Sequence, residues 1–153
     1  MSWSRAPLPA LNLSQESQAP LMVLAQTVLG EAEGEPDDGK LAVAYSVVNR
    51  AEDVRGRWSQ DISKVCLQPF QYSCWLADSP RVATMRAPSV HVKPDIWEAS
   101  FRAACAAMYK LRLDPTHGAN HYLTTTLAEG TPPSWFDPTK VTARIAHHLF
   151  LRL

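Results

Sequence analysis

The chain has 153 residues, of which 46% are hydrophobic, and its 15 basic side chains balance 15 acidic ones, so the formal net charge is zero. This length and composition are typical of a globular domain with its own core, and they exclude a disordered chain. Because Lys and Arg are not in excess, we expect no nucleic-acid partner. No apolar run approaches the roughly 18 residues that span a membrane, so we expect no membrane insertion.

The first 20 residues, MSWSRAPLPALNLSQESQAP, contain no continuous hydrophobic run. A secretory signal peptide needs such a run, so we expect the protein to be synthesised in the cytoplasm without a signal peptide. This segment is rich in Pro, Ser and Gln. We therefore interpret residues 1–19 as an irregular lead-in and residues 20–153 as a single domain.

Helical spacing of apolar residues dominates the chain from residue 20 onwards. Pro20 suits a first helical turn, and Leu24 and Val28 after it share one helix face. A second apolar stripe follows the turn GEPDDG, and a third, the strongest, begins at Pro94 and is expected to form the central buried helix. The predicted helices are 20–32, 40–53 and 94–113, with short helices near 61–66 and 75–85 inside a long irregular segment at 53–93.

Two stretches near the C-terminus have the composition of β-strands. Residues 121–127, HYLTTTL, are rich in Tyr and Thr, and residues 143–153, ARIAHHLFLRL, are compatible with a strand that closes the domain. The predicted fold class is therefore α+β, mainly helical with a small antiparallel β-sheet.

Five acidic residues crowd the turn between the first two predicted helices, and one of them differs from the rest. Glu31 lies three residues after Val28 and seven after Leu24, so it continues the apolar helix face. A carboxylate in that place is partly desolvated, which favours the protonated form that a general acid needs. A frayed helix end with Glu31 in water fits the pattern equally well. Structural or solvated roles are expected for the other four, with the aspartates capping the next helix: Glu33, Glu35, Asp37 and Asp38.

The histidines do not form a recognisable metal motif. A zinc site that uses His117, His121 and one of the pair His147 and His148 is conceivable. However, adjacent residues on a strand point to opposite faces, and the chain has no HExxH helix. We therefore expect no metal and no cofactor.

The three cysteines are too few for a disulfide framework. Cys66 and Cys74 flank the compact segment CLQPFQYSC and could form a bridge after export. Cys105 lies within an apolar helical pattern and is expected to be a small buried residue.

Four sequence blocks, in order, resemble the cell wall hydrolases of the spore cortex-lytic enzyme type. They are VLAQTVLGEAEGEPDDGKLAVAYSVVNR, VCLQPFQYSCW, GANHYL and IAHHLF, and the similarity covers roughly residues 20–150. This resemblance implies a lysozyme-like α+β domain related to lytic transglycosylases. It also implies cleavage of the peptidoglycan glycan strand between N-acetylmuramic acid and N-acetylglucosamine.

The same resemblance assigns roles to individual residues. It makes Glu31, the first Glu of the family's G-E turn, the catalytic acid. The sequence departs from the family pattern at Glu33, where Arg is common. Tyr72 replaces a Phe, and His121 stands where an aromatic residue is common. The residues expected to bind the glycan are Gln71, Ser73, Tyr122, Tyr72 and His121.

The predicted function is that of a peptidoglycan glycosidase of the lytic transglycosylase or muramidase type. The alternatives are a zinc-dependent N-acetylmuramoyl-L-alanine amidase and a non-catalytic wall-binding module. The resemblance further suggests a bacteriophage or prophage endolysin, a monomer that reaches the cell wall or periplasm after holin-assisted release.

Overall fold

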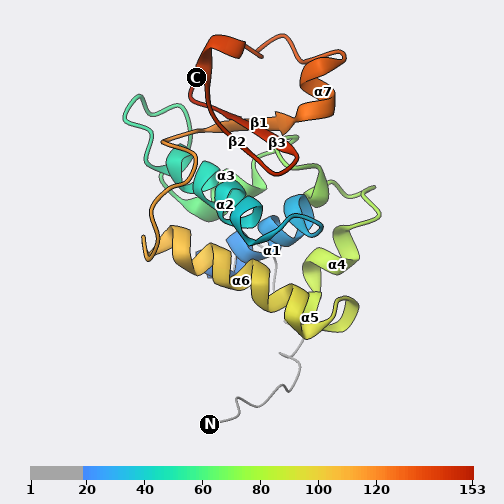
Figure 1. The fold of residues 1–153 in the computed structure, drawn as a ribbon. Coiled ribbons are helices and arrows are strands. Elements are labelled where there is room, and N and C mark those ends of the chain that lie inside the picture. The colour runs from blue at the N-terminus through green and yellow to red at the C-terminus, as the bar shows by residue number, and fades with distance from the viewer. Residues whose placement is uncertain (1–18) are drawn as a thin grey trace.

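The computed structural model describes residues 19–153, so the predicted lead-in at 1–19 lies almost entirely outside the described residues. A layer of helices carries a small antiparallel sheet on one side (Figure 1). This arrangement confirms the expected α+β class. The elements are α1 (Pro20–Ala32), α2 (Asp37–Ala51), α3 (Ile62–Leu67), η2 (Ser73–Trp75), α4 (Val82–Arg86), α5 (Pro88–His91), α6 (Pro94–Met108), β1 (His121–Thr124), α7 (Thr125–Glu129), η3 (Pro138–Lys140), β2 (Val141–Ile145) and β3 (His148–Leu151).

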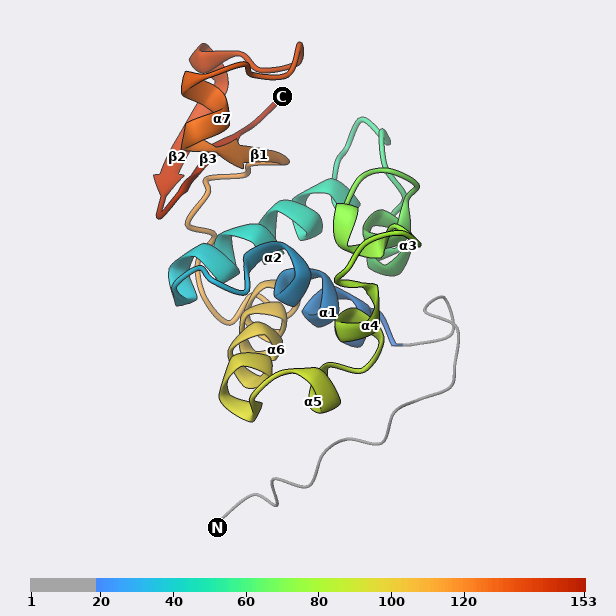
Figure 2. The ribbon, with the colours of Figure 1, turned by 90° about the vertical axis from the view of Figure 1, so that its right-hand side faces the viewer.

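Helix α1 is the centre of the fold. It spans Pro20–Ala32, as predicted, with Pro20 in its first turn. Every residue from Val23 to Leu29 is buried, because α2, α3, α4 and α6 all pack around this helix (Figure 2). The expectation that the helix starting at Pro94 would be central is therefore wrong. Helix α6 is buried along one face only, while α1 is enclosed on all sides.

Helix α2 begins at Asp37, three residues earlier than predicted. Asp37 and Asp38 occupy its first turn, where their charges complement the helix dipole, and Pro36 is the N-cap. No side chain caps the helix, so the expected capping role of the two aspartates is wrong. The predicted apolar stripe is confirmed, since all its members are buried: Leu41, Ala44, Val47, Val48 and Ala51.

Helix α6 ends at Met108, five residues before its predicted end. Lys110 adopts a left-handed backbone with φ 54°, and the amide of Leu111 donates to the carbonyl of Ala106. This is the hydrogen-bond pattern of a Schellman motif, which stops a helix. Leu111, predicted as part of the buried stripe, is consequently exposed.

The irregular segment at 53–93 contains a short helix, α3, close to the predicted range 61–66. Asp61 caps α3 by accepting a hydrogen bond from the amide of Ser63 at 2.9 Å. The second expected helix, near 75–85, is replaced by the 3₁₀ turn η2 and the separate helix α4.

The sheet has the strand order β1-β3-β2, with both pairs antiparallel. The predicted strand at 121–127 ends at Thr124, because the Thr124 hydroxyl accepts from the amide of Leu127 and starts helix α7. The predicted strand at 143–153 is a hairpin. Ala146, with φ 51°, and His147 form the turn between β2 and β3.

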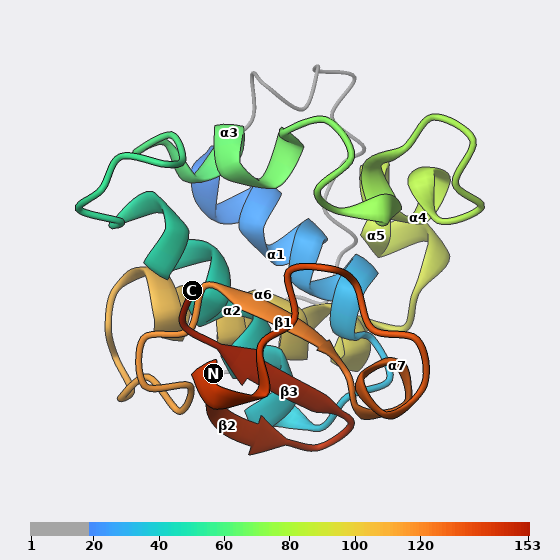
Figure 3. The same ribbon diagram turned by 90° about the horizontal axis from the view of Figure 1, so that it is seen from above.

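The sheet rests on the helical layer through a small apolar contact of its own. Seen from above, it covers α2 and lies beside the C-terminal end of α1 (Figure 3). Phe150 of β3 is fully buried there. Its buried neighbours are Ala32, Ala42, Val43 and Ala119. This contact brings the end of α1, where Glu31 lies, against strand β1.

Candidate active site around Glu31

Glu31 lies in the last turn of α1, and its side chain is half-buried. Its Oε2 accepts a hydrogen bond of 3.1 Å from the Tyr122 hydroxyl on β1. Its Oε1 is buried and has no hydrogen-bond partner among residues 19–153. A buried acceptor without a donor is costly, and a donor from a bound ligand would satisfy it. This acid is therefore set apart from an ordinary surface carboxylate.

The Tyr122 hydroxyl is neutral when it donates its hydrogen bond to Glu31. Burial, together with the negative charge of Glu31, raises the pKa of Tyr122 well above its ordinary value. The hydroxyl therefore keeps its proton at neutral pH. The ring lies edge-on to His148 at 5.4 Å between centroids and tilts against Phe150 at 5.8 Å.

The helix turn that presents Glu31 is packed without spare room. A Cβ added to Gly30 would lie 2.5 Å from both Cys74 Cβ and Met85 Sδ, so only glycine fits there. Burial, and after it the charge of Glu31, raises the pKa of the Cys74 thiol. Cys74 and Met85 thus form the apolar surface against which the helix turn of Glu31 packs.

All three cysteines are free thiols. The bridge between Cys66 and Cys74 that could follow export is not formed in this structure, where both side chains are buried. Burial also raises the pKa of Cys66, to about 12. Cys105, expected to be buried, is half-buried.

Arg50, near the end of α2, links three parts of the site, and its side chain is only 7% exposed. Its Nε donates to the carbonyl of Asn120 at 2.7 Å, and its Nη1 donates to Gln71 Oε1 at 3.0 Å. The guanidinium also lies over the rings of Trp58 and Tyr72, at 5.2 and 5.6 Å. Arg50 therefore fixes the start of β1 and the segment around Gln71 relative to α2.

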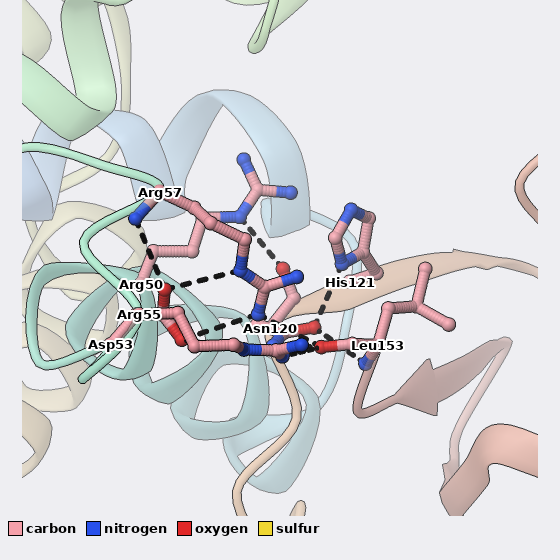
Figure 4. A network of polar contacts seen from close by, with 7 residues as sticks. All are labelled: Arg50, Asp53, Arg55, Arg57, Asn120, His121 and Leu153. Atoms are coloured by element: carbon pink, nitrogen blue, oxygen red, sulfur yellow. Dashed lines mark hydrogen bonds and ion pairs between the residues drawn. The ribbon is translucent and has the colours of Figure 1, made fainter.

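Asn120 continues this network toward the end of the chain (Figure 4). Its Oδ1 accepts from the amide of Leu153 at 3.0 Å, and its Nδ2 donates to the carbonyl of the same residue at 3.1 Å. Arg57, which is paired with Asp53, also donates to that carbonyl at 2.8 Å. These contacts hold the segment before β1 in place.

The neighbouring Asn49 secures the loop that leads into β1. Its Nδ2 donates to Asp114 Oδ2 at 2.9 Å and to the carbonyl of Ala119 at 2.8 Å. Burial tends to raise the pKa of Asp114, but hydrogen bonds from Thr116, Asn49 and Gly118 outweigh it and lower that pKa. Asn49 and Arg50, near the end of α2, thus hold residues 114–120 in place.

The predicted glycan-binding residues fall into different positions. Gln71 and Ser73 are exposed. The negative charge of Glu31 helps to raise the pKa of Tyr72 and of Cys74, the two residues that flank Ser73. Tyr72 itself is only 4% exposed, and its hydroxyl is buried without a partner. A direct sugar contact by Tyr72 does not fit this position, because its ring serves as the stacking surface for Arg50.

His121 lies between two tryptophans on the same side of the molecule. Its ring is 5.8 Å from that of Trp58 and 5.1 Å from that of Trp135, which is 39% exposed. Burial, and then the charges of Arg50 and Arg57, lower the pKa of His121 to about 4. Because Asn120 Oδ1 accepts at 2.8 Å from Nδ1, the neutral ring keeps its proton there and leaves Nε2 as an acceptor. Trp58, His121 and Trp135 form a row of rings of the kind that stacks on sugars.

The two other glutamates of the turn, Glu33 and Glu35, are paired rather than free. Glu33 Oε2 lies 2.5 Å from Arg81 Nη2, and Glu35 lies within 3.3 Å of His147 and His148. The buried Lys40 amine donates to the main-chain carbonyls of Glu33 and Glu35. The expected structural role is confirmed for the turn, but the Glu35 side chain is 9% exposed and so is not solvated.

No metal site is assembled within residues 19–153. His117, His121, His147 and His148 do not gather, and no group of three His, Cys, Asp or Glu side chains there could hold an ion. The donor set of the zinc amidase alternative is therefore missing from the described part of the chain. Within the same range, none of the helices is both long and apolar enough to cross a membrane.

Sequence reasoning missed Arg50, Trp58, Trp135 and Asn120. Arg50 follows Val43 and Val47 at helical spacing, so a charged residue on a buried face was a usable signal. The two tryptophans lie in loops without periodicity, and nothing local connects them to His121.

A half-buried acid with one oxygen held by a tyrosine suits a general acid, and aromatic rings on the same domain suit a carbohydrate-cleaving enzyme. Residues 34–151 match the model of the Cell Wall Hydrolase family, so the chain belongs to that family. This membership confirms the expected class of enzyme. The matched range begins three residues after Glu31, so the role of Glu31 depends on its geometry and on the resemblance of the turn.

Two solved structures have the same fold. The catalytic domain of the germination-specific lytic transglycosylase SleB from Bacillus anthracis is 26% identical, with a TM-score of 0.64, and the match covers 89% of this chain and 96% of that one. The catalytic domain of the Bacillus cereus SleB protein is 22% identical, with a TM-score of 0.65, and the match covers 99% and 98%. No curated protein sequence matches.

Proposed function

We propose that this enzyme cleaves the glycan strand of peptidoglycan between N-acetylmuramic acid and N-acetylglucosamine, with Glu31 as its catalytic acid. The observation that carries the proposal is the asymmetric environment of the Glu31 carboxyl. One oxygen is held by Tyr122, and the other is buried without a partner. The similarity to a catalytic domain described as a lytic transglycosylase supports the same reaction.

Glu31 acts in both halves of the reaction. It first donates its proton to the glycosidic oxygen, and the bond from that oxygen to the muramic acid C1 breaks. The resulting carboxylate then takes the proton of the muramic acid C6 hydroxyl, whose oxygen bonds to C1 and closes a 1,6-anhydro ring. No water is consumed, and Glu31 ends in its starting protonation state. The two other glutamates of the turn are engaged with Arg81 and with two histidines, so neither is needed as a second catalytic carboxylate.

The glycan lies against the exposed side chains around Glu31. Gln71 and Ser73 offer hydrogen bonds, and the Trp58, His121 and Trp135 rings offer a stacking surface. Tyr122 orients the acid, while Tyr72 supports Arg50 from below the surface. Because Arg50 donates to Gln71, that side chain is oriented before substrate arrives.

Digestion of purified peptidoglycan by wild type and Glu31→Gln tests the proposal. Gln keeps the size of the side chain but cannot transfer a proton, so the rate should fall by a factor of about 100 or more with folding unchanged. Glu98→Gln is the matched control, since Glu98 is exposed on α6, where it pairs with Arg102. Full activity of Glu31→Gln would contradict the assignment.

Mass spectrometry of the released fragments identifies the reaction. Anhydro-muropeptides indicate a transglycosylase, whereas reducing muramic ends indicate hydrolysis by water. Free stem peptides and inhibition by a chelator would instead indicate an amidase. Binding of peptidoglycan without any soluble product would indicate a wall-binding module.

We also propose that the enzyme is a monomeric endolysin, made in the cytoplasm and released to the wall by a holin. The three cysteines of the folded protein are free thiols, so the fold suits a reducing compartment. Expression in a bacterial cytoplasm should leave cells intact until a holin is co-expressed. Lysis without the holin would contradict the release route, and light scattering after gel filtration measures the oligomeric state.

A further inference from the structure

Glu35, in the turn that follows Glu31, has an environment that the proposed reaction does not explain. Its side chain is 9% exposed although it belongs to a surface turn. His147 Nδ1 lies 3.3 Å from both of its oxygens, and His148 Nδ1 lies 3.2 Å from Oε1. A carboxylate is rarely kept away from water unless its surroundings hold it there.

Helix α2 provides the space and the anchor for this carboxylate. Gly39 has no side chain where Glu35 passes, and a Cβ there would lie 2.9 Å from Glu35 Cβ and 3.3 Å from Oε2. The Lys40 amine, 5% exposed, donates to the carbonyls of Glu33 and Glu35 and fixes the main chain of the turn. The position of Glu35 is therefore determined by Gly39 and Lys40 of the helix that follows it.

His148 connects Glu35 to the catalytic site. The ring is buried, and it meets the ring of Tyr122 edge-on, with 5.4 Å between centroids and 82° between planes. Sheet register explains the contact: Tyr122 pairs with Phe150 and Thr124 pairs with His148, so Tyr122 and His148 are diagonal neighbours across β1 and β3. The approach of His148 to Glu35 is close in distance but lacks the alignment of a hydrogen bond.

The charged and titratable groups that face His148 include Glu35, His147 and Glu31, together with the Tyr122 ring. Burial lowers the pKa of His148 below its ordinary value, although the charge of Glu35 opposes this change. The ring is therefore neutral when the enzyme works near neutral pH. A neutral ring packed between the Glu35 carboxylate and the Tyr122 ring can keep the two at a fixed separation.

We propose that Glu35 and His148 are positioning residues that hold the Tyr122 ring so that its hydroxyl stays on Glu31. The contacts run from Glu35 to His148, from His148 to Tyr122, and from the Tyr122 hydroxyl to Glu31 Oε2. Both ends of this series lie in the same turn, so the turn presents the acid and also supports the residue that orients it. The inference rests on the proposed function of Glu31 and deepens it.

A double-mutant cycle on kcat and KM tests this role, with soluble uncrosslinked glycan strands as substrate. His148→Ala removes the ring that packs against Tyr122. We expect kcat to fall about tenfold with KM changed by less than about twofold, because orientation of the acid matters most in the transition state. Tyr122→Phe should give a similar loss. The double variant should be no slower than Tyr122→Phe alone, since His148 acts only through that hydroxyl.

Two further variants separate the ring from the charge. His148→Phe keeps a ring against Tyr122 and should recover most of the lost kcat. Glu35→Gln should lower kcat about threefold in wild type and leave kcat unchanged in the His148→Phe background, where its partner is absent. His91→Ala is the control, because His91 is exposed at the end of α5 and belongs to neither the sheet nor the turn that carries Glu35, so kcat should not change.

The outcomes distinguish this inference from the proposed function. Losses from His148→Ala and Tyr122→Phe that multiply in the double variant, or full kcat in His148→Ala, would overturn the positioning role alone. Release of stem peptides by the wild type, or full activity of Glu31→Gln, would overturn the proposed function first. Thermal unfolding of each variant shows whether it is folded, and His148→Phe replaces His148→Ala in the cycle if the latter is not.

Discussion

At the scale of single residues, His121 is neutral because its surroundings oppose a second proton. Burial, Arg50 and Arg57 lower its pKa to about 4, against an ordinary value of about 6.5. The unfolded chain therefore binds a proton below about pH 6.5, while the folded protein does so only near pH 4. Stability supplied by the neutral ring is complete above about pH 6.5 and is lost as the pH falls toward 4.

His121→Gln tests this contribution, because Gln keeps a polar side chain and does not titrate. Urea unfolding at pH 7 and pH 5 should show that the variant loses less stability than wild type over this interval. The difference should be about 1 kcal/mol, since the half-buried ring is partly screened by solvent. An equal loss in both proteins would show that His121 does not titrate as described.

Some of these residue environments could be read from the sequence, and others could not. The helical phase of Leu24 and Val28 distinguished Glu31 from the other acids without excluding a frayed helix end, and the resemblance of the turn to a known family gave its expected role. The burial of Glu35 could not be predicted, because it depends on Gly39 in the next helix and on His148, more than 100 residues later in the chain. Long-range pairing of this kind leaves no local pattern in either segment.

At the scale of elements, the predicted helices were most accurate where burial alone determines them. Helix α1 has its predicted bounds, since its apolar residues and Pro20 favour the same conformation. Three other boundaries depend on single non-glycine residues: Lys110 ends α6, Ala146 forms the hairpin turn, and Thr124 caps α7. Lys110 and Ala146 have no preference for the left-handed backbone, and Thr124, although a good N-cap, lies within a run of threonines that favours a strand, so the predicted elements continued past the observed ends.

The tight packing of the last turn of α1 can be tested by changing Gly30. In Gly30→Ala the new Cβ would lie 2.5 Å from Cys74 Cβ and Met85 Sδ, and this overpacking should destabilise the protein by about 1–3 kcal/mol. Activity should also fall, because the adjacent Glu31 must shift. Gly34→Ala, in the loop that follows α1, is the control: none of the described atoms would lie within 4 Å of its Cβ, so stability should change by less than about 0.5 kcal/mol. Equal effects of the two changes would contradict this packing.

At the scale of the whole molecule, the active site lies between two unequal parts. The helices share a large core around α1, whereas the sheet rests on α2 through Phe150 and a few small residues. Glu31 belongs to the helical part, and Tyr122 and His121 belong to the sheet. The catalytic arrangement therefore depends on the docking of the sheet, which Arg50 and Asn49 of α2 reinforce.

This division predicts that the sheet opens before the helices unfold. Regions with few buried apolar contacts open with a lower free energy than the global value, and the amides of β1 and β3 should exchange hydrogen through such openings. Arg50→Ala should lower the opening free energy of the Phe150 amide by about 2 kcal/mol, because it removes two hydrogen bonds to a charged group, and it should leave the Ala104 amide of α6 nearly unchanged. Native-state hydrogen exchange at low denaturant measures both amides in one experiment. Activity should then disappear at denaturant concentrations where α6 is still protected, since Tyr122 leaves Glu31 when the sheet detaches. If the two amides exchange with equal free energies in wild type and fall together in Arg50→Ala, the domain unfolds as one unit and the separate opening of the sheet is ruled out.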